Sequence, residues 1–146
     1  MIIENINDFN KKLVDSFIKR IPTIMEIEKD ILENMIIIRN DLSVLGMISY
    51  ENYMDKGLIR YFVFQKDVSF EDLELLFDEM KKKAEKDEIK YLITVIEDEE
   101  LMVFFEKLGF KKIDTKRLYL YETALIDTVY SKAICMIYEM KEGLAC

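Results

Sequence analysis

The sequence contains no histidine and no tryptophan, and it has only two cysteines, one proline and four glycines in 146 residues. Without histidine, the chain cannot by itself form a Ser-His or Cys-His catalytic pair or a zinc site with imidazole ligands. The two cysteines, Cys135 and Cys146, are too few for a cysteine-only zinc cage or a disulfide framework, and free thiols are typical of a reducing compartment. We therefore expect no metal site.

Positive charge and long apolar runs are also scarce. Lys and Arg total 21 against 29 Asp and Glu, so the formal net charge is −8, and this balance disfavours non-specific binding to nucleic acid. The longest apolar runs, such as residues 35–38, are far too short to cross a bilayer. The first residues lack a basic segment followed by a long apolar stretch. The sequence thus predicts a cytoplasmic protein without nucleic-acid or membrane partners.

The overall composition is that of a folded protein. Hydrophobic residues make up 51% of the chain and charged residues 34%, a mixture typical of globular proteins. The length suits one domain, since domains usually hold about 100–200 residues. No linker, internal repeat or low-complexity tract divides the sequence. We therefore predict a single domain over residues 1–146.

The first third of the sequence alternates between strand and helix patterns. A short strand at residues 1–5 precedes a helix that Asn7 or Asp8 caps. Pro22 ends this helix and starts a second one. The apolar positions of the two helices recur at helical spacing; they are Phe9, Leu13, Val14, Phe17, Ile18 and Ile21, and then Ile24, Ile27, Ile31 and Leu32.

Three strand patterns follow, at residues 36–38, 43–53 and 58–65. Turns at Asn40-Asp41 and at Asp55-Lys56-Gly57 separate them, which predicts an antiparallel meander.

The second half of the sequence begins with a helix that Ser69 caps, with Asp72 three residues later. A strand at residues 91–96 comes next, and the helix between it and the meander predicts a parallel strand pair made by a right-handed crossover. A helix over residues 98–108 then ends at Gly109 and Phe110. Strands at residues 111–121 and 132–140 complete the chain.

Residues 104–110 read Phe-Phe-Glu-Lys-Leu-Gly-Phe. This segment resembles the late helix of the Gcn5-related N-acetyltransferase (GNAT) family, usually Phe-Tyr-Glu-Lys-Leu-Gly-Phe. The element order and the meander, with Gly46-Met47-Ile48-Ser49 in its second strand, are also similar to that family. The resemblance covers nearly the whole chain and implies an α+β fold with a mixed, mostly antiparallel sheet flanked by helices. Another layered α/β sandwich is the alternative fold.

The resemblance implies an N-acyltransferase. Acetyl-CoA or another acyl-CoA would lie where a parallel strand pair splays apart, and backbone N–H groups before a helix would bind its pyrophosphate. The acceptor would be a small-molecule amine or a protein amine. The resemblance also allows a homodimer, in which two copies of the chain pair through their last strands. The residues at the corresponding cofactor-binding positions are Phe64, Gln65, Val68, Ser69, Phe70, Glu71, Asp72, Asp98 and Phe105.

The sequence departs from the family pattern at three places. The loop at residues 65–73 has no glycine, although glycine lets a backbone approach phosphates closely, and the charges of Glu71 and Asp72 oppose a pyrophosphate. Phe105 replaces a tyrosine that often protonates the leaving thiolate, and Asp98 stands where the family often has asparagine. These departures support an alternative function, a catalytically degenerate GNAT-like module that senses a ligand or binds a protein partner.

Glu97 is the candidate catalytic base. It follows the predicted central strand, where it would deprotonate the acceptor amine or hold its ammonium group. The alternative is that residues 97–100 only complement a helix dipole.

Other polar residues carry weaker hypotheses. Glu51 and Tyr53 would face an acceptor or form a solvated strand face, and Arg60 and Tyr61 would flank a ligand or simply pack across strands. Cys135 lies in an apolar strand, which predicts a buried structural thiol.

Overall fold

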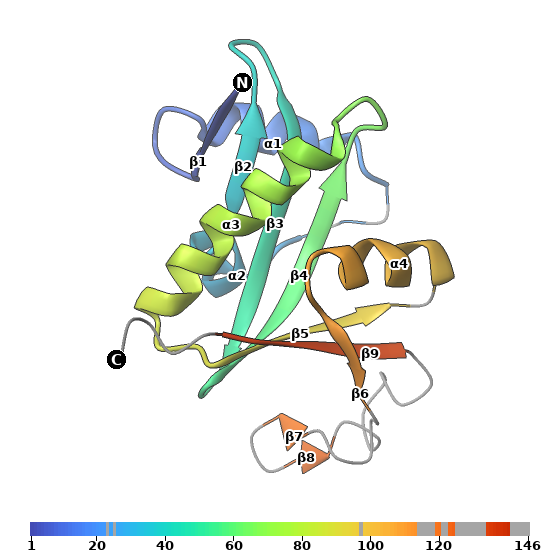
Figure 1. The fold of residues 1–146 in the computed structure, drawn as a ribbon. Helices are drawn as coiled ribbons and strands as arrows, with labels where there is room; N and C mark the ends of the chain where they lie inside the picture. Colours follow the sequence, from blue (N-terminus) through green and yellow to red (C-terminus); the bar gives the residue numbers. More distant parts are fainter. Residues whose placement is uncertain are drawn as a thin grey trace. The chain divides into compact units, whose positions relative to one another are not determined.

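The computed structural model describes residues 1–22, 24, 26–96, 98–113, 119–120, 123–124 and 134–140. Its elements are labelled in Figure 1. They are β1 (Ile2–Asn5), α1 (Lys11–Lys19), α2 (Lys29–Glu33), β2 (Ile36–Arg39), β3 (Val44–Tyr53), β4 (Lys56–Phe64), α3 (Phe70–Lys86), β5 (Tyr91–Ile96), α4 (Glu99–Lys107), β6 (Lys111–Ile113), β7 (Tyr119–Leu120), β8 (Thr123–Ala124) and β9 (Ile134–Glu139).

The strands form a seven-stranded sheet in the order β1-β2-β3-β4-β5-β9-β6, and β7 pairs with β8. The β1/β2, β2/β3, β5/β9 and β6/β9 pairs are antiparallel, whereas β4 and β5 are parallel. The predicted α+β class, with a mixed, mostly antiparallel sheet and flanking helices, is confirmed, and so is the parallel pair. By their internal packing, residues 1–51 and 60–83 form a first compact unit, and residues 52–59 and 84–146 a second. The single domain over residues 1–146 stays a prediction.

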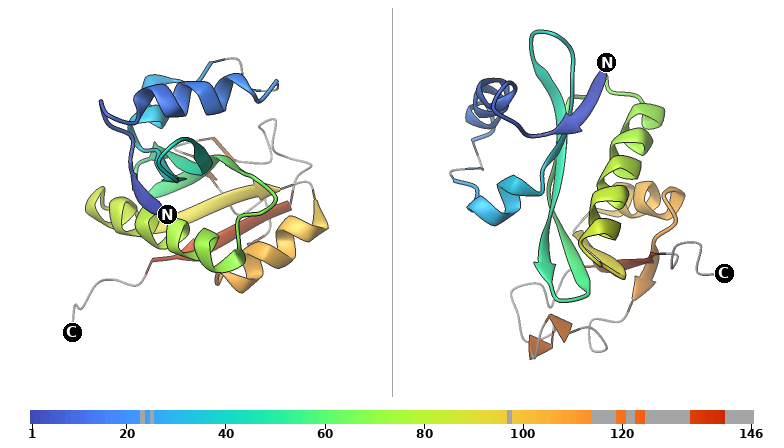
Figure 2. Two further views of the ribbon diagram at one scale, coloured as in Figure 1. Left: turned by 90° about the horizontal axis from the view of Figure 1, so that it is seen from above. Right: turned by 90° about the vertical axis from the view of Figure 1, so that its left-hand side faces the viewer.

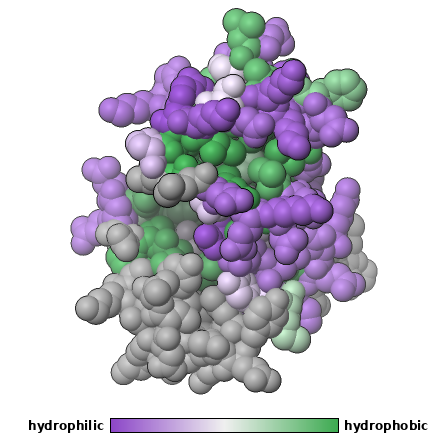
Figure 3. Space-filling view, turned by 180° about the vertical axis from the view of Figure 1, so that it is seen from behind, coloured by the Kyte–Doolittle hydropathy of each residue, from purple (hydrophilic) through white to green (hydrophobic). Residues whose placement is uncertain are grey.

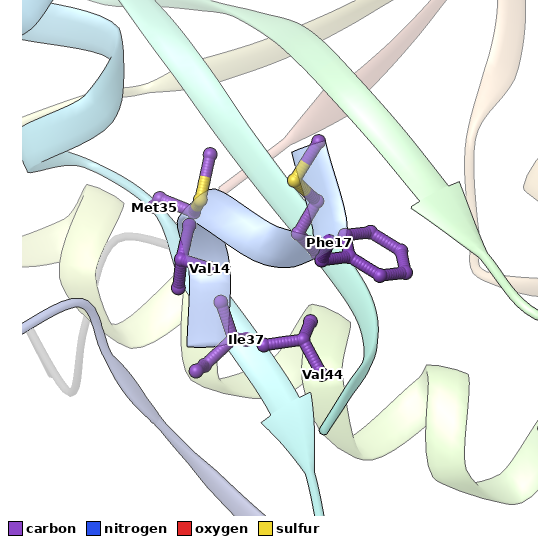
Figure 4. Close-up of a cluster of buried hydrophobic side chains, with 6 residues drawn as sticks. Val14, Phe17, Met35, Ile37 and Val44 are labelled. Carbon is purple, nitrogen blue, oxygen red and sulfur yellow. The ribbon is translucent and has the colours of Figure 1, made fainter. Parts of the chain in front are cut away.

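The first unit packs helices on both faces of its strands. Helices α1 and α2 cover one face of β2 and β3, and α3 covers the other (Figure 2). Figure 4 shows the hydrophobic cluster beneath α1. Its fully or almost fully buried members are Val14, Phe17, Met35, Ile37, Val44 and Met47. Burial of each such side chain stabilises the fold by about 1.5–3 kcal/mol. Hydrophobic residues also come to the surface on the rear face, with hydrophilic residues around them (Figure 3).

Two asparagines position the start of α1. The side-chain oxygen of Asn7 accepts hydrogen bonds from the N–H groups of Phe9 and Asn10, both at 2.9 Å, and that of Asn10 accepts one from the N–H of Asn7 at 2.8 Å. Asn10 is 1% exposed and also donates to Glu4 Oε1 at 3.0 Å and to the Asn5 carbonyl at 2.9 Å. The N-cap of α1 is Asn10, so the predicted cap, Asn7, instead bonds the turn that leads into the helix.

Two expectations for this region are wrong. Phe9 is 97% exposed, because it lies in the turn before α1 and not on its buried face. The second helix begins at Lys29 and not directly after Pro22. Ile24 and Ile27 still pack against the core cluster, from chain that precedes the helix.

In the second unit, a two-residue turn at Met54 and Asp55 leads into β4, and Met54 adopts a φ of 60°. The predicted turn, Asp55-Lys56-Gly57, is therefore displaced by one residue, and Gly57 lies buried inside β4 opposite Leu92. The parallel ladder joins Lys56, Gly57 and Leu58 to Tyr91, Leu92 and Ile93, whereas β9 pairs with all six residues of β5.

The end of α4 follows its prediction. Gly109 adopts a φ of 104° and donates its N–H to the Glu106 carbonyl at 3.0 Å, while Phe110 donates to the Phe105 carbonyl at 3.0 Å. The rings of Phe105 and Phe110 lie 5.1 Å apart, which adds the hydrophobic contact expected of this Schellman motif.

The last strands differ from their predictions. In place of one strand over residues 111–121, the structure has β6 (Lys111–Ile113) and a separate β7, which pairs with β8. The strand predicted at residues 132–140 is β9, over Ile134–Glu139, and residues 132 and 133 lie outside the described residues. Within the described ranges, no helix is long and apolar enough to cross a membrane.

Candidate functional site

The loop after β4 is a tight turn. Gln65 donates its N–H to the Leu45 carbonyl at 2.9 Å, which continues the strand pairing one residue beyond Phe64. The N–H of Val68 then donates to the Gln65 carbonyl at 3.1 Å, and the Val68 side chain is buried at 8% exposure. The chain thus reverses over residues 65–68 without a glycine and delivers Ser69 to the start of α3.

Ser69 caps α3. Its hydroxyl oxygen accepts the N–H of Asp72 at 3.1 Å, and its carbonyl accepts the N–H of Leu73 at 3.1 Å, which is the first helical hydrogen bond. The predicted cap is confirmed. The N–H groups of Phe70 and Glu71 come before that first bond, in the turn where a helix presents its donors and its positive dipole end. An anion at this point meets a favourable backbone.

The acidic side chains around this turn, in contrast to its backbone, disfavour an anion. Asp67 and Glu71 are exposed, and Asp72 is half-buried. A pair of unit charges about 4 Å apart in water interacts by about 1 kcal/mol, and salt screens such interactions over about 8–10 Å. The carboxylates therefore weaken phosphate binding here by a modest, salt-dependent amount.

A second polar group lies in the same unit, on β3 and β4. Arg60 donates from Nη1 to Oε1 of Glu51 at 2.8 Å, and its guanidinium carbon lies 5.2 Å from the centre of the Tyr61 ring. Tyr61 has a φ of 55°, a left-handed conformation inside a strand. The sequence singled out Glu51 and the Arg60–Tyr61 pair separately. It held no sign of the left-handed conformation of Tyr61, because no glycine marks this position.

At the start of α4, the described acidic residues of the segment 97–100 stabilise this end of the helix. Asp98 accepts the N–H of Glu100 at 2.8 Å and is the N-cap of the helix. Glu99 and Glu100 are exposed in its first turn, where they complement the dipole. Glu97 lies outside the described residues, so its role as base stays a prediction.

Phe105 belongs to the core of the second unit. It is 2% exposed, and its ring meets those of Phe104 at 5.6 Å and Phe110 at 5.1 Å. Its assignment to cofactor binding stays a prediction.

Cys135 is a structural thiol, as predicted. It is 1% exposed and packs with Leu58 and Ile93, and burial raises the pKa of its thiol to about 11. Cys146 lies outside the described residues. Among the residues that the structure describes, no three His, Cys, Asp or Glu side chains are grouped so that they could hold a metal ion.

Comparison with known proteins places this fold. No protein-family model matches the sequence, and no curated protein matches it significantly. Solved structures do match: N-acetylglutamate synthase from Neisseria gonorrhoeae, complexed with coenzyme A and N-acetyl-glutamate, has a TM-score of 0.72 and 14% sequence identity over 95% of this chain and 35% of its own. The chain thus spans about a third of the length of that enzyme.

Two further matches extend over whole proteins. Rv2747 from Mycobacterium tuberculosis, in a complex with CoA, has a TM-score of 0.66 and 15% identity over 95% of this chain and 99% of its own. An acetyltransferase of the GNAT family from Staphylococcus aureus Mu50 has a TM-score of 0.66 and 16% identity over 96% and 99%. At identities this low, the structural similarity establishes the fold alone. The fold implied by the sequence resemblance is confirmed.

Proposed function

We propose that this chain, which has the fold of the GNAT acetyltransferases, is an N-acyltransferase that transfers an acyl group, in the first instance acetyl, from acyl-CoA to an amine. The similar N-acetylglutamate synthase and Rv2747 structures both contain coenzyme A, which supports the choice of co-substrate. The observation that carries the proposal is the passage from β4 through the turn at residues 65–68 to the capped N-terminus of α3.

We assign the pyrophosphate to the first turn of α3. The backbone of residues 68–72 would bind it, with Phe64 and Gln65 leading into the turn. The fit is partial, because Val68 and Asp72 already donate their N–H groups to Gln65 and Ser69. The first turn and its dipole remain a favourable site for an anion. We therefore expect affinity that depends strongly on the neighbouring carboxylates.

Bound acyl-CoA supplies an activated thioester, from which the acyl carbon passes to the amine nitrogen as the C–S bond breaks and the thiolate leaves. The chain must remove the proton of the amine, and Glu97 is our candidate for that base. Phe105 has no proton to give the thiolate. A general acid contributes roughly 100- to 10,000-fold, so its absence slows the reaction without abolishing it.

Calorimetric titration with acetyl-CoA and with CoA tests the proposal. We expect micromolar dissociation constants, followed by release of CoA when an amine acceptor is present. Absence of binding up to millimolar ligand would refute the proposal and leave the alternative of a non-catalytic module.

A pair of matched variants tests the assigned position. Glu71→Gln with Asp72→Asn removes two negative charges beside the first turn of α3, and Glu85→Gln with Glu88→Gln removes two exposed ones from the end of that helix and the loop after it. We expect the first variant to bind CoA several-fold more tightly at low salt, with the gain shrinking as salt is added, and the second to bind as the wild type does. Equal affinities for both variants would show that the phosphates lie elsewhere.

A further inference from the structure

We infer that Glu51, Arg60 and Tyr61 form the acceptor-binding site, and that the acceptor is a free amino acid, a small amine that carries a carboxylate. This inference rests on the proposed function but concerns a separate step, the binding of the acceptor. It starts from the backbone of β4 and from the charges that this backbone brings together.

Consecutive residues of a regular strand point to opposite faces of a sheet. Arg60 and Tyr61 do not, because their side chains lie against one another, with the guanidinium carbon 5.2 Å from the ring centre. The φ of 55° at Tyr61 accounts for this break in alternation. A non-glycine residue in this conformation costs of order 1–3 kcal/mol, and such strain is concentrated at functional sites. The strain here places a cation and an aromatic ring side by side.

The opposing strand supplies the anion. Glu51 meets Arg60 through one carboxylate oxygen, Oε1, at 2.8 Å, and the two side chains are 24% and 31% exposed. The pair is therefore shielded from bulk water but still accessible to a ligand. A carboxylate has acceptor capacity for several hydrogen bonds, so Glu51 can take a ligand ammonium beside Arg60.

The strand that holds Glu51 is firmly anchored to α2. The Ser49 hydroxyl donates a hydrogen bond to the Ile31 carbonyl, and Asn34 donates to the Tyr50 carbonyl at 3.0 Å. Ser49 and Tyr50 are both fully buried. These contacts fix the two residues that precede Glu51, so the carboxylate projects from a rigid backbone, as a binding site requires.

The charges of this site select the ligand. A simple amine is a cation, so it is attracted by Glu51 but repelled by Arg60 a few ångströms away. A simple anion is attracted by Arg60 but repelled by Glu51. An amino acid carries both charges: its ammonium group donates to Glu51, and its carboxylate accepts from Arg60, whose guanidinium geometry suits carboxylates. Only such a ligand opens the Glu51–Arg60 pair without leaving a shielded charge uncompensated.

The test measures the binding of all twenty standard amino acids. Wherever removal of the carboxylate leaves a simple amine, that amine is measured as well; leucine, for example, is compared with 3-methylbutylamine and lysine with 1,5-diaminopentane. Binding is measured by calorimetry with and without saturating CoA. We expect at least one amino acid to bind, and its amine to bind at least about tenfold more weakly. No binding by any amino acid, or equal binding of acid and amine, would overturn the inference.

Variants identify the residues. Arg60→Gln should weaken amino-acid binding at least about tenfold. The matched control is Arg39→Gln, because Arg39 forms a similarly shielded ion pair with Glu4, at 2.6 Å and with 19% and 27% exposure, elsewhere in the same unit. Should Arg60→Gln fail to fold, Arg60→Lys keeps a cation beside Glu51 but loses the fork of N–H donors that suits a carboxylate, and it should still weaken amino-acid binding. Unchanged affinity in the folded variant would refute the assignment.

The two proposals fail separately. CoA binding without amino-acid binding overturns the acceptor site and leaves the transferase proposal standing. Amino-acid binding that depends on Arg60, with no CoA binding, supports the site and overturns the transferase.

Discussion

Replacing Gly109 by alanine tests how α4 is ended. Gly109 adopts a φ of 104°, a region that residues with a side chain rarely enter. A Cβ atom at this position would lie 3.1 Å from Cε2 of Tyr138 and 3.5 Å from its Cδ2. The Tyr138 ring, which also packs against Phe110, would have to shift by a few tenths of an ångström. Both the backbone and the contact therefore oppose the new methyl group.

The magnitude follows from three contributions. A residue with a side chain in such a conformation costs about 1–3 kcal/mol, and the displaced tyrosine ring adds to this. Alanine restricts the unfolded chain more than glycine does, which returns about 0.4–1 kcal/mol. We expect a net loss of about 1–2 kcal/mol in the free energy of unfolding. With a urea m-value of about 2 kcal/mol/M, the midpoint falls by about 0.5–1 M.

Urea denaturation followed by circular dichroism measures this shift. The matched control is Glu106→Ala, an exposed position three residues earlier in the same helix, for which we expect a change within about 0.5 kcal/mol. If Gly109→Ala unfolds at the same urea concentration as the wild type, the left-handed helix end described above is wrong.

Three further predictions concern ionisable groups. Glu97→Gln should lower kcat/KM by roughly 100- to 10,000-fold in an assay of CoA release and remove the acid limb of the pH–rate profile; an unchanged profile would exclude Glu97 as the base. In a Cys146→Ser variant, Cys135 should react with a thiol reagent much more slowly at pH 8 in the folded protein than in denaturant, because burial raises its pKa to about 11. Since that pKa is raised from 9.0, its contribution to stability is complete below about pH 9 and is lost as the pH rises to about 11; fast labelling of the native protein would contradict the burial. Hydrogen bonds from Asn10 and Arg39 lower the pKa of Glu4 below 4.5. Its contribution is therefore present above about pH 4.5 and is lost as the pH falls through the folded pKa, so the destabilisation caused by Glu4→Gln should shrink in acid; a constant difference between the two unfolding curves from pH 7 to pH 3 would exclude this linkage.

Local rules account for the parts of the fold that the sequence predicts well. Ser69 and Gly109 mark helix ends because each satisfies a backbone group next to it in the chain, and both act as predicted. The β-branched residues of β2 and β5 predict these two strands correctly, because their side chains favour the extended backbone.

The sequence did not predict several backbone conformations, even local ones. Phe9 looks like a member of an apolar stripe, but the hydrogen bonds of Asn7 hold it in a turn outside the helix. The turn at Met54 places a methionine at positive φ, which propensity does not anticipate. The left-handed conformation of Tyr61 is likewise not revealed by any residue pattern.

The asparagine pair before α1 also has a consequence for hydrogen exchange. Strand β1 is at one edge of the sheet, where local opening normally lets amide protons exchange quickly. Asn10 joins this strand to the helix start, and the amides of Asn7 and Asn10 are bonded to side chains and not to a ladder or a helix. These two amides should exchange together with those of β1 and α1, as one cooperative unit, although they belong to neither element.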